Sequence, residues 1–360
     1  MDKVNELKYD SIYQKLQKFE SLGIKQVGTP ALDVTAEWII AQHQLYGYSG
    51  IEVDSFFYGP NHVYNIIVTK PGMVYPDTYL IVDGHYDTYN GPGVNDNGSG
   101  TAIVLEVARL MANVETKYSI KFIHFTIEEL GLIGSYHYVD SIVIPQQMDI
   151  RLVFNIDEVG GVAGEVNNTI TCERDEWAPN SNNAASAAFT DTLATLTEQY
   201  SDLNTQIYYA YGSDYVPFML NGYVVTGFYE SNESPYPHSI NDSLSNLDPE
   251  YVFQVARASL AAIIYFAGNI DIASDQKEFI SQIDLNISPN PFGQHFEITN
   301  PLNETIQIRL FDLAGKLMFK STVQEFSSAT IKPVLKPGIY LINIINTDGL
   351  ILYEGKAIKK

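Results

Sequence analysis

Carboxylate and imidazole side chains recur in this sequence at the points where apolar runs end. In the segment VDGHYDT, His85 and Asp87 follow such a run, and Asp96 comes shortly afterwards in a loop rich in glycine and asparagine. Later runs are followed in the same way by Glu128, Glu129, Asp157 and His238. Neutral imidazoles and carboxylates are ligands for zinc, so the pattern predicts metal chemistry.

Five of these groups form a ligand set for two zinc ions, with one carboxylate that bridges both metals. The set comprises His85, Asp96, Glu129, Asp157 and His238. A single catalytic zinc usually takes three protein ligands and keeps one position open, so five ligands are too many for one ion. Glu128 is then free to act as a base. A lone histidine at a strand end is more often structural, but recurrence at four strand ends favours a metal site.

Other hydrolytic chemistries find no support in the motifs. The sequence contains no H-E-x-x-H helix of a one-zinc protease and no G-x-S-x-G elbow of a serine hydrolase. The remaining histidines lack acidic neighbours in the sequence and are predicted to have core or surface roles: His43, His62, His124, His137 and His295.

The elements that must position these groups alternate between buried strands and helices. The apolar runs predicted as strands are 63–69, 79–85, 119–126, 151–158 and 223–230. Helical patterning is found at 101–113, 183–200 and 249–270. The alternation predicts an α/β fold with a mixed, mainly parallel sheet covered by helices. Such sheets place ligands at the carboxyl ends of their strands, where the candidate groups lie.

Length, composition and charge describe a folded, acidic chain of more than one domain. Its 360 residues exceed what one hydrophobic core usually supports. The net charge of −22 argues against nucleic acid or an anionic membrane as a partner. No apolar run is long enough to span a bilayer, which needs about 18 residues. The first ten residues, MDKVNELKYD, lack the apolar core of a secretory signal peptide and leave the compartment open.

The texture of the sequence changes near residue 284. Residues 285–360 carry eight Lys/Arg and six Asp/Glu, so the acidic excess lies entirely upstream. This tail consists of short strand-like runs separated by turns, without any periodic segment of helix length. The sequence therefore predicts a domain at 1–275 that carries the metal site, a linker at 276–284 and a small all-β sandwich at 285–360.

The motifs around the candidate ligands closely resemble the zinc-aminopeptidase family that contains the bacterial leucyl aminopeptidases. Glutaminyl cyclases and glutamate carboxypeptidase II are relatives of that family. The resemblance covers roughly residues 10–270. Its motifs are H-Y-D at 85–87, N-D-N-G-S-G at 95–100, E-E-L-G at 128–131 and P-H-S-I-N-D at 237–242.

The resemblance implies a role for each metal ligand. His85 and Asp157 would hold one zinc, Glu129 and His238 would hold the other, and Asp96 would bridge the two ions.

The same resemblance implies roles for the neighbouring residues. Glu128 would be the general base that takes a proton from the water bridging the metals and so forms hydroxide. Asp87 would orient the ring of His85 by contacting the ring nitrogen that does not bind the metal. The family often has a non-proline cis peptide after the bridging aspartate, so Asp96–Asn97 is a candidate for one.

The substrate loop departs from the family pattern. Members often carry Ser-Asp-His there, whereas this chain has Ser213, Asp214 and Tyr215. A family tyrosine near the loop helps to polarise the substrate carbonyl. Tyr209 and Tyr211 are the candidates for that role, with a shift in register.

The tail resembles the C-terminal sorting domain used for type IX secretion by Bacteroidetes-type bacteria. The matching segments are ISPNPF at 287–292, IRLFDLAGKLMF at 308–319, LKPGIYLINI at 335–344 and the basic end GKAIKK. This resemblance implies a secreted or cell-surface protein that meets the secretion machinery through residues 285–360. A carbohydrate-binding or merely stabilising β-module is the alternative.

The two resemblances together predict a secreted di-zinc aminopeptidase that acts on peptides with a free N-terminus. A glutaminyl-peptide cyclotransferase is one alternative, which would work with a single zinc. A carboxypeptidase or dipeptidase of the same superfamily is another, but no basic residue beside the motifs stands out to hold a substrate carboxylate. A catalytically inactive module that binds peptides or glycans is the alternative from a different class.

Overall fold

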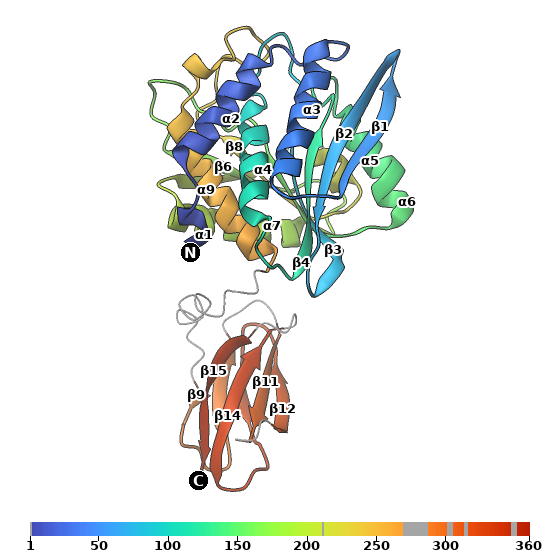
Figure 1. The fold of residues 1–360 in the computed structure, drawn as a ribbon. Coiled ribbons are helices and arrows are strands. Elements are labelled where there is room, and N and C mark those ends of the chain that lie inside the picture. The colour runs from blue at the N-terminus through green and yellow to red at the C-terminus, as the bar shows by residue number, and fades with distance from the viewer. Residues whose placement is uncertain (1, 211, 269–286, 301–304, 313–315, 347–350) are drawn as a thin grey trace. The chain divides into compact units, whose positions relative to one another are not determined.

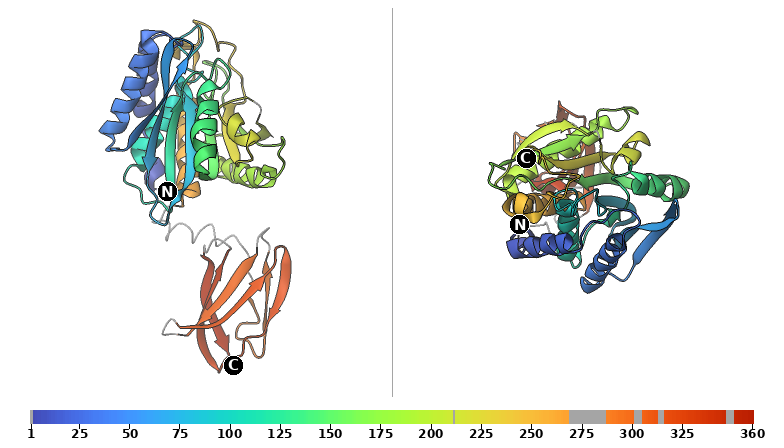
Figure 2. Two further views of the ribbon diagram at one scale, coloured as in Figure 1. Left: turned by 90° about the vertical axis from the view of Figure 1, so that its right-hand side faces the viewer. Right: turned by 90° about the horizontal axis from the view of Figure 1, so that it is seen from above.

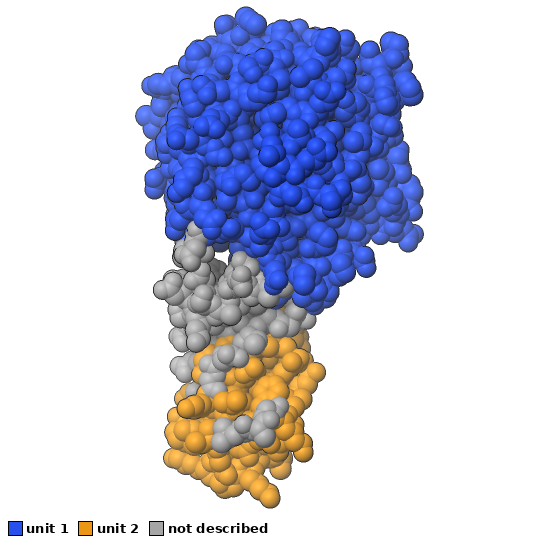
Figure 3. Space-filling view, in the orientation of Figure 1, with its two compact units in different colours: residues 1–270 blue, residues 271–360 orange. Residues whose placement is uncertain are grey.

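The computed structural model of the chain describes residues 2–210, 212–268, 287–300, 305–312, 316–346 and 351–360. The chain divides into two compact units, residues 1–270 and residues 271–360 (Figure 3). The predicted linker 276–284 lies outside the described residues, so the limits of the domains stay a prediction.

A mixed eight-stranded sheet forms the centre of the first unit (Figure 1). Its order is β1-β2-β4-β3-β5-β8-β6-β7. The strands are β1 (Ile51–Tyr58), β2 (Asn61–Lys70), β3 (Tyr75–His85), β4 (Tyr118–Phe125), β5 (Asp149–Ile156), β6 (Thr169–Arg174), β7 (Asn204–Tyr209) and β8 (Val225–Glu230). All five apolar runs predicted as strands lie in this sheet. The predictions missed β6 and the two edge strands, β1 and β7, which alternate poorly or are largely exposed.

The four central strands β4, β3, β5 and β8 are neighbours, and each pair among them is parallel. Antiparallel pairing joins β1 to β2, β2 to β4 and β6 to β8, while β7 runs parallel to β6. Parallel strands end on the same side of a sheet, so the carboxyl ends of the central four strands lie along one edge.

Helices cover both faces of the sheet (Figure 2). One face carries α2 (Tyr9–Ser21), α3 (Pro30–Leu45), α4 (Gly98–Met111), α7 (Asn183–Tyr200) and α9 (Pro249–Phe266). The other carries α5 (Ile133–Tyr138), the π-helix η1 (Val139–Val143), α6 (Ile144–Gln146) and α8 (Val216–Leu220). Two short helices remain: α1 (Asp2–Asn5), which contacts α9, and the 3-10 helix η2 (Leu244–Asn246), which contacts α2. None of the helices among the described residues has the length and apolarity needed to cross a bilayer.

The alternation of side chains along β2 explains how one strand serves two cores. Ile66 packs in the cluster that contains Leu105 of α4, whereas its neighbour Ile67 packs in the cluster that contains Phe218 of α8. Successive side chains of a strand point to opposite faces, so a strand covered on both sides must be apolar at consecutive positions. This is the physical reason why the central strands were visible as uninterrupted apolar runs.

The second unit is a sandwich of two antiparallel sheets. Its strands are ordered β13-β10-β9 in one sheet and β12-β11-β14-β15 in the other. Their bounds are β9 (Ile287–Ser288), β10 (Phe296–Asn300), β11 (Ile306–Phe311), β12 (Leu317–Val323), β13 (Ser327–Ile331), β14 (Gly338–Ile345) and β15 (Ile351–Lys359). The sheets share one core, to which Phe296, Ile308 and Ile342 contribute. The predicted fold class is confirmed for both units.

Because each unit buries a core of its own, we predict that a truncated chain ending at Asp275 folds by itself. Circular dichroism should show helix content retained and one cooperative melting transition. Its midpoint should lie within a few degrees of the corresponding transition of the full chain. A truncated protein that aggregates or melts without cooperativity would show that the second unit completes the first.

Candidate metal centre

The parallel strands bring four of the predicted ligands to one edge of the sheet. His85 is the last residue of β3, and Asp157 comes directly after β5. Glu129 lies just beyond β4, and His238 lies in the loop after β8. Since these strands are adjacent and parallel, residues far apart in the sequence meet at their carboxyl ends.

The fifth ligand, Asp96, is placed by the start of α4. The side chain of Asn97 accepts a hydrogen bond from the N–H of Gly100 (2.8 Å) and donates one to the carbonyl of Ile156 (2.9 Å). A Cβ on Gly100 would lie 2.1 Å from that same carbonyl, so only glycine lets the helix start this close to the end of β5. The Asp96–Asn97 peptide is cis, as predicted. Asp96 is therefore held beside Asp157.

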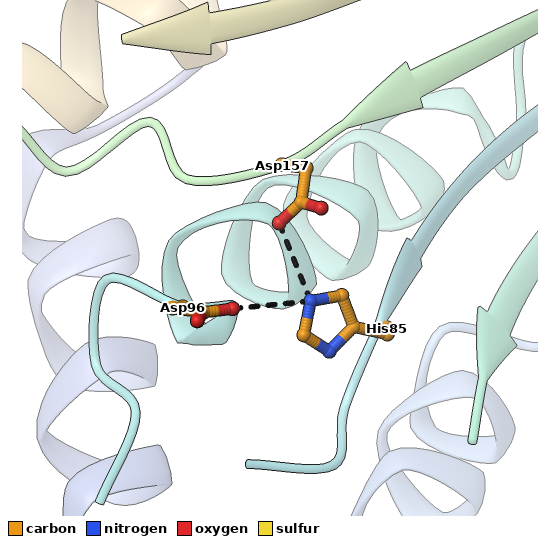
Figure 4. Close-up of side chains that lie close together, drawn as sticks. All are labelled: His85, Asp96 and Asp157. Carbon is orange, nitrogen blue, oxygen red and sulfur yellow. Dashed lines mark ion pairs between the residues drawn. The ribbon is translucent and has the colours of Figure 1, made fainter. Parts of the chain in front are cut away.

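His85, Asp96 and Asp157 form a first, buried group of ligands (Figure 4). The Nε2 atom of His85 lies 3.2 Å from Oδ1 of Asp96 and 3.3 Å from Oδ1 of Asp157. Figure 4 shows the two carboxylates converging on this nitrogen from the loop before α4 and from the end of β5.

Asp96, Glu129 and His238 form a second group that shares the carboxylate of Asp96. Nε2 of His238 lies 3.2 Å from Oδ2 of Asp96 and 2.8 Å from Oε2 of Glu129. Asp96 thus turns one oxygen toward each histidine. The side chain of His238 is 56% exposed and that of His85 is 1% exposed, so the second group lies nearer to solvent.

The donor atoms of both groups fit zinc. At Zn–N and Zn–O bonds of about 2.0–2.2 Å, the corners of a tetrahedron are roughly 3.3–3.5 Å apart, close to three of the four separations above. Nε2 of His85, Oδ1 of Asp157 and Oε1 of Glu129 are buried and have no hydrogen-bond partner within the described part of the chain. Buried polar atoms without partners are costly, and a bound cation would satisfy them.

The electrostatics of the site also call for a cation. Burial raises the pKa of Glu129 to about 8, with a contribution from the charge of Asp96. Burial raises the pKa of Glu128 well above its usual range, and Asp157 adds to the effect. For His85, burial favours the neutral ring, but Asp157 and Glu128 outweigh it and raise the pKa. Burial is the main cause for the two glutamates, and neighbouring negative charge contributes to all three shifts, which a divalent ion would offset.

Asp87 holds both glutamates and the ring of His85. Its carboxylate accepts hydrogen bonds from the N–H groups of Glu128 (3.0 Å) and Glu129 (3.4 Å). Nδ1 of His85 lies 3.1 Å from the carbonyl oxygen of Asp87 and 3.5 Å from its carboxylate. The sequence predicted that the carboxylate of Asp87 orients His85, but the carbonyl oxygen of Asp87 lies closer to the ring nitrogen than the carboxylate does. Oε2 of Glu128 lies 3.8 Å from Nε2 of His85, outside both ligand groups.

The loop that departs from the family pattern contacts the first ligand group. The hydroxyl of Ser213 donates a hydrogen bond to Oδ2 of Asp157 (2.7 Å), which leaves Oδ1 for the metal. Asp214 is fully buried, and burial raises its pKa to about 7. Tyr215 donates a hydrogen bond from its hydroxyl to Oε1 of Glu173 (3.0 Å) in the protein interior. The sequence marked these three residues only as a departure and did not predict these contacts.

The structure does not test the prediction that two tyrosines polarise a substrate carbonyl. Tyr209 ends the edge strand β7, with its ring 6.1 Å from that of Trp177 and 4.3 Å from that of Tyr208. Tyr211 lies outside the described residues. Their role stays a prediction.

Two of the histidines predicted to have core or surface roles are buried and contact each other: Nε2 of His43 lies 3.1 Å from Nε2 of His124. His137, for which the sequence shows no acidic neighbour, contacts Asp54 of β1 at 3.0 Å in the folded chain. Sequence reasoning also missed the buried polar groups Asn95, Glu230 and Asp242 behind the ligand loops. The sequence signals for them are their places in quoted segments: Asn95 opens the N-D-N-G-S-G motif, Glu230 ends the run 223–230 and Asp242 closes the P-H-S-I-N-D motif.

With the geometry established, comparison with known proteins identifies the family. The family model described as Peptidase family M28 matches residues 65–263, more than half of the chain. The chain belongs to peptidase family M28. A second model, described as Secretion system C-terminal sorting domain, matches residues 286–359. Both predicted resemblances are confirmed.

Among curated relatives, aminopeptidase YwaD of Bacillus subtilis is 32% identical over 206 residues, which cover 55% of this chain and 44% of that protein. The chain spans less than half the length of the first curated relatives that it matches.

Among solved structures, LapB from Legionella pneumophila has a TM-score of 0.64 at 24% identity, with 74% of each chain covered. A glutaminyl cyclase from Macrostomum lignano has a TM-score of 0.64 at 17% identity, with 73% of this chain and 90% of that chain covered. These likenesses establish the fold.

The two ligand groups predict different outcomes for the neighbouring glutamates. The wild-type chain should retain about two zinc equivalents after dialysis, one for each ligand group. Glu128→Gln should retain the same amount, because Glu128 belongs to neither group. Glu129→Gln should retain about one, because the second group loses a charged ligand. Elemental analysis of the dialysed proteins measures both. If the two variants exchanged phenotypes, the roles of the pair would be reversed.

Proposed function

We propose that this M28 family member is a secreted aminopeptidase that binds two zinc ions and removes N-terminal residues from peptides. The observation that carries the proposal is the carboxylate of Asp96, whose two oxygens face His85 and His238. A shared carboxylate of this kind is the hallmark of a two-metal site. The curated relative named above, YwaD of Bacillus subtilis, is an aminopeptidase by name, which supports the choice of reaction.

In this proposal, His85, Asp96 and Asp157 hold one zinc, and Asp96, Glu129 and His238 hold the other. Two bound zinc ions would supply a Lewis acid for the peptide carbonyl and would acidify water. Glu128 accepts the proton of the attacking water and passes it to the departing amine. Its side chain is 15% exposed and its carboxylate faces His85 at 3.8 Å, so it is near the ligands without being one of them.

Access to the site supports an exopeptidase. The exposed His238 marks the side from which solvent and substrate reach the ligands, while His85 closes the buried side. Carboxylates crowd this site, so a free α-ammonium group of a peptide would be attracted to it at short range. An acetylated N-terminus lacks that charge and should bind poorly.

A glutaminyl cyclase is the second candidate, favoured by the fold shared with the enzyme from Macrostomum lignano. That likeness concerns the fold alone. The presence of both ligand groups in this chain favours two metals, and therefore the peptidase.

We also propose that the second unit directs export. Residues 286–359 match a sorting domain, and this unit has a core of its own that includes none of the ligand residues. It would meet the secretion machinery and deliver the enzyme to the cell surface or the medium.

The activity is tested with a panel of aminoacyl-p-nitroanilides and matched N-acetylated substrates. We expect the free-amine substrates to be cleaved, the acetylated ones to be spared, and a chelator to abolish activity. Glu128→Gln should lower kcat by roughly 10²–10⁴-fold, the usual contribution of a positioned acid–base group. Cleavage of acetylated substrates alone would rule out an aminopeptidase and leave the metal site intact. Cyclisation of an N-terminal glutamine in the absence of peptide cleavage would favour the second candidate.

Export is tested by deleting the residues after Asp275 in a host that has type IX secretion. The deleted form should accumulate inside the cell envelope, because it has lost the sorting domain, and should keep its peptidase activity within a few-fold. Immunoblots of the medium, cell surface and envelope fractions measure its location. Secretion of the deleted form at the wild-type level would show that the tail is a module of another kind.

A further inference from the structure

One buried carboxylate joins the two loops that carry Asp96 and His238. The side chain of Asp242 accepts hydrogen bonds from two successive main-chain N–H groups, with Oδ1 bound to that of Asn95 (2.7 Å) and Oδ2 to that of Asp96 (3.0 Å). Asp242 is only 2% exposed. Both of its oxygens are thereby committed to the main chain of the loop that carries the shared ligand.

The main chain of Asp242 continues the connection on both sides. Its carbonyl accepts a hydrogen bond from the N–H of Val94 (3.3 Å), and its N–H donates to the carbonyl of Ser239 (3.0 Å). Ser239 directly follows His238. A Cβ on Gly91 would lie 1.8 Å from the Ser239 carbonyl, so the two loops also touch at this point. A hydrogen-bonded turn of a few residues therefore fixes the position of His238 relative to that of Asp96.

The two ligand groups depend on this connection to different degrees. His85 ends a central strand, Asp157 directly follows another, and Ser213 fixes the second oxygen of Asp157. Glu129 is held through its N–H by Asp87. His238 lies eight residues beyond β8 in a loop, and its side chain is largely exposed. Of the five ligands, it is the one whose place depends most on contacts between loops.

We propose that Asp242 is a positioning residue that sets the affinity of the second metal position, formed by Asp96, Glu129 and His238, and has much less effect on the first. The inference rests on the two-metal function proposed above. Residues behind the ligands typically change metal affinity by about 10–100-fold when they are replaced. The role of Asp242 is geometric, because its carboxylate aligns two loops without touching a metal.

Other contacts hold the Asp96 loop in place when Asp242 is altered. The ammonium group of Lys25 donates to the carbonyl of Pro92 (2.6 Å), and the amide of Asn95 donates to Oε1 of Glu230 (3.0 Å). At the far end, Asn97 bonds to the carbonyl of Ile156. When Asp242 is altered, the loop that carries Asp96 should therefore shift relative to His238 but stay attached to the rest of the domain.

The test is Asp242→Asn in the full chain. The substitution keeps the shape but turns an NH2 group toward one of the two main-chain N–H groups, which removes one hydrogen bond and sets two donors against each other. Chelator-treated protein is titrated with zinc against a chromophoric competitor. We expect the dissociation constant for the second zinc to rise about 10–100-fold and that for the first to change less than about threefold.

Asp248→Asn is the matched control. Oδ1 of Asp248 accepts hydrogen bonds from the N–H groups of Glu250 (3.1 Å) and Tyr251 (3.4 Å) at the start of α9. The variant therefore replaces a carboxylate oxygen by an NH2 group in the same way, but at a place outside the ligand loops. Asparagine caps a helix about as well as aspartate, so this variant should keep Tm within a few degrees of the wild type. It should leave both zinc affinities within about threefold of the wild type.

The possible outcomes separate the inference from the proposed function. A wild-type chain that binds one zinc in its active form would overturn the two-metal function itself. Two zinc ions in the wild type with unchanged or equally weakened affinities in Asp242→Asn would overturn only the role of Asp242.

If Asp242→Asn does not fold, Ser239→Ala makes the same test at the surface. The hydroxyl of Ser239 accepts a hydrogen bond from the N–H of Asn241 (3.2 Å) and donates one to the carbonyl of Tyr236 (2.7 Å). Its loss should loosen the turn between His238 and Asp242 and weaken the second zinc at least about threefold, with the first unchanged. Equal effects on both zinc ions, or none, would overturn the inference.

Discussion

The carboxylate of Asp96 must face two imidazoles at once, and most features of the first unit can be traced to that requirement. One oxygen lies 3.2 Å from His85 and the other lies 3.2 Å from His238. His85 ends β3 and His238 lies in the loop after β8, and β5 lies between these two strands in the sheet. Asp96 therefore has to stand in front of the carboxyl edge, which requires a short loop, a helix that begins at once and a glycine where that helix meets β5.

Negative charge is gathered at this edge at a considerable cost, which the contacts among the described residues offset only in part. Burial raises the pKa of several of its carboxyl groups, and three ligand atoms are buried without a hydrogen-bond partner among the described residues. Main-chain N–H groups supply part of the compensation, as at Asp87 and Asp242. A divalent cation would supply the remainder, so the same burial that raises the cost of these charges would favour its binding.

Rigidity is distributed unevenly across the two ligand groups. The first group is attached to the ends of two central strands, whose main-chain hydrogen bonds fix the directions of His85 and Asp157. The second reaches outward to a loop residue, His238, whose φ of 59° lies in the left-handed region and whose side chain faces solvent. In the proposed two-metal site, the buried group would hold its ligands firmly, while the accessible group would admit a substrate.

Much of this protein could be predicted from its sequence alone, because the central strands are apolar at consecutive positions and the ligand types follow them directly. That pattern predicted the α/β class, which the structure confirms, and the five candidate ligands, which the structure brings together in two groups. The change of texture near residue 284 revealed the β-sandwich, and the role of Glu128 stays a prediction. Only the tertiary structure showed which oxygen of Asp96 faces which histidine, that the hydroxyl of Ser213 bonds to Asp157, and that Asp242 joins two loops. Edge strands such as β7 and buried partners such as Asp242 carry no periodic signal. Their roles arise from contacts between segments up to 147 residues apart in the sequence, which only the packing of the folded chain brings together.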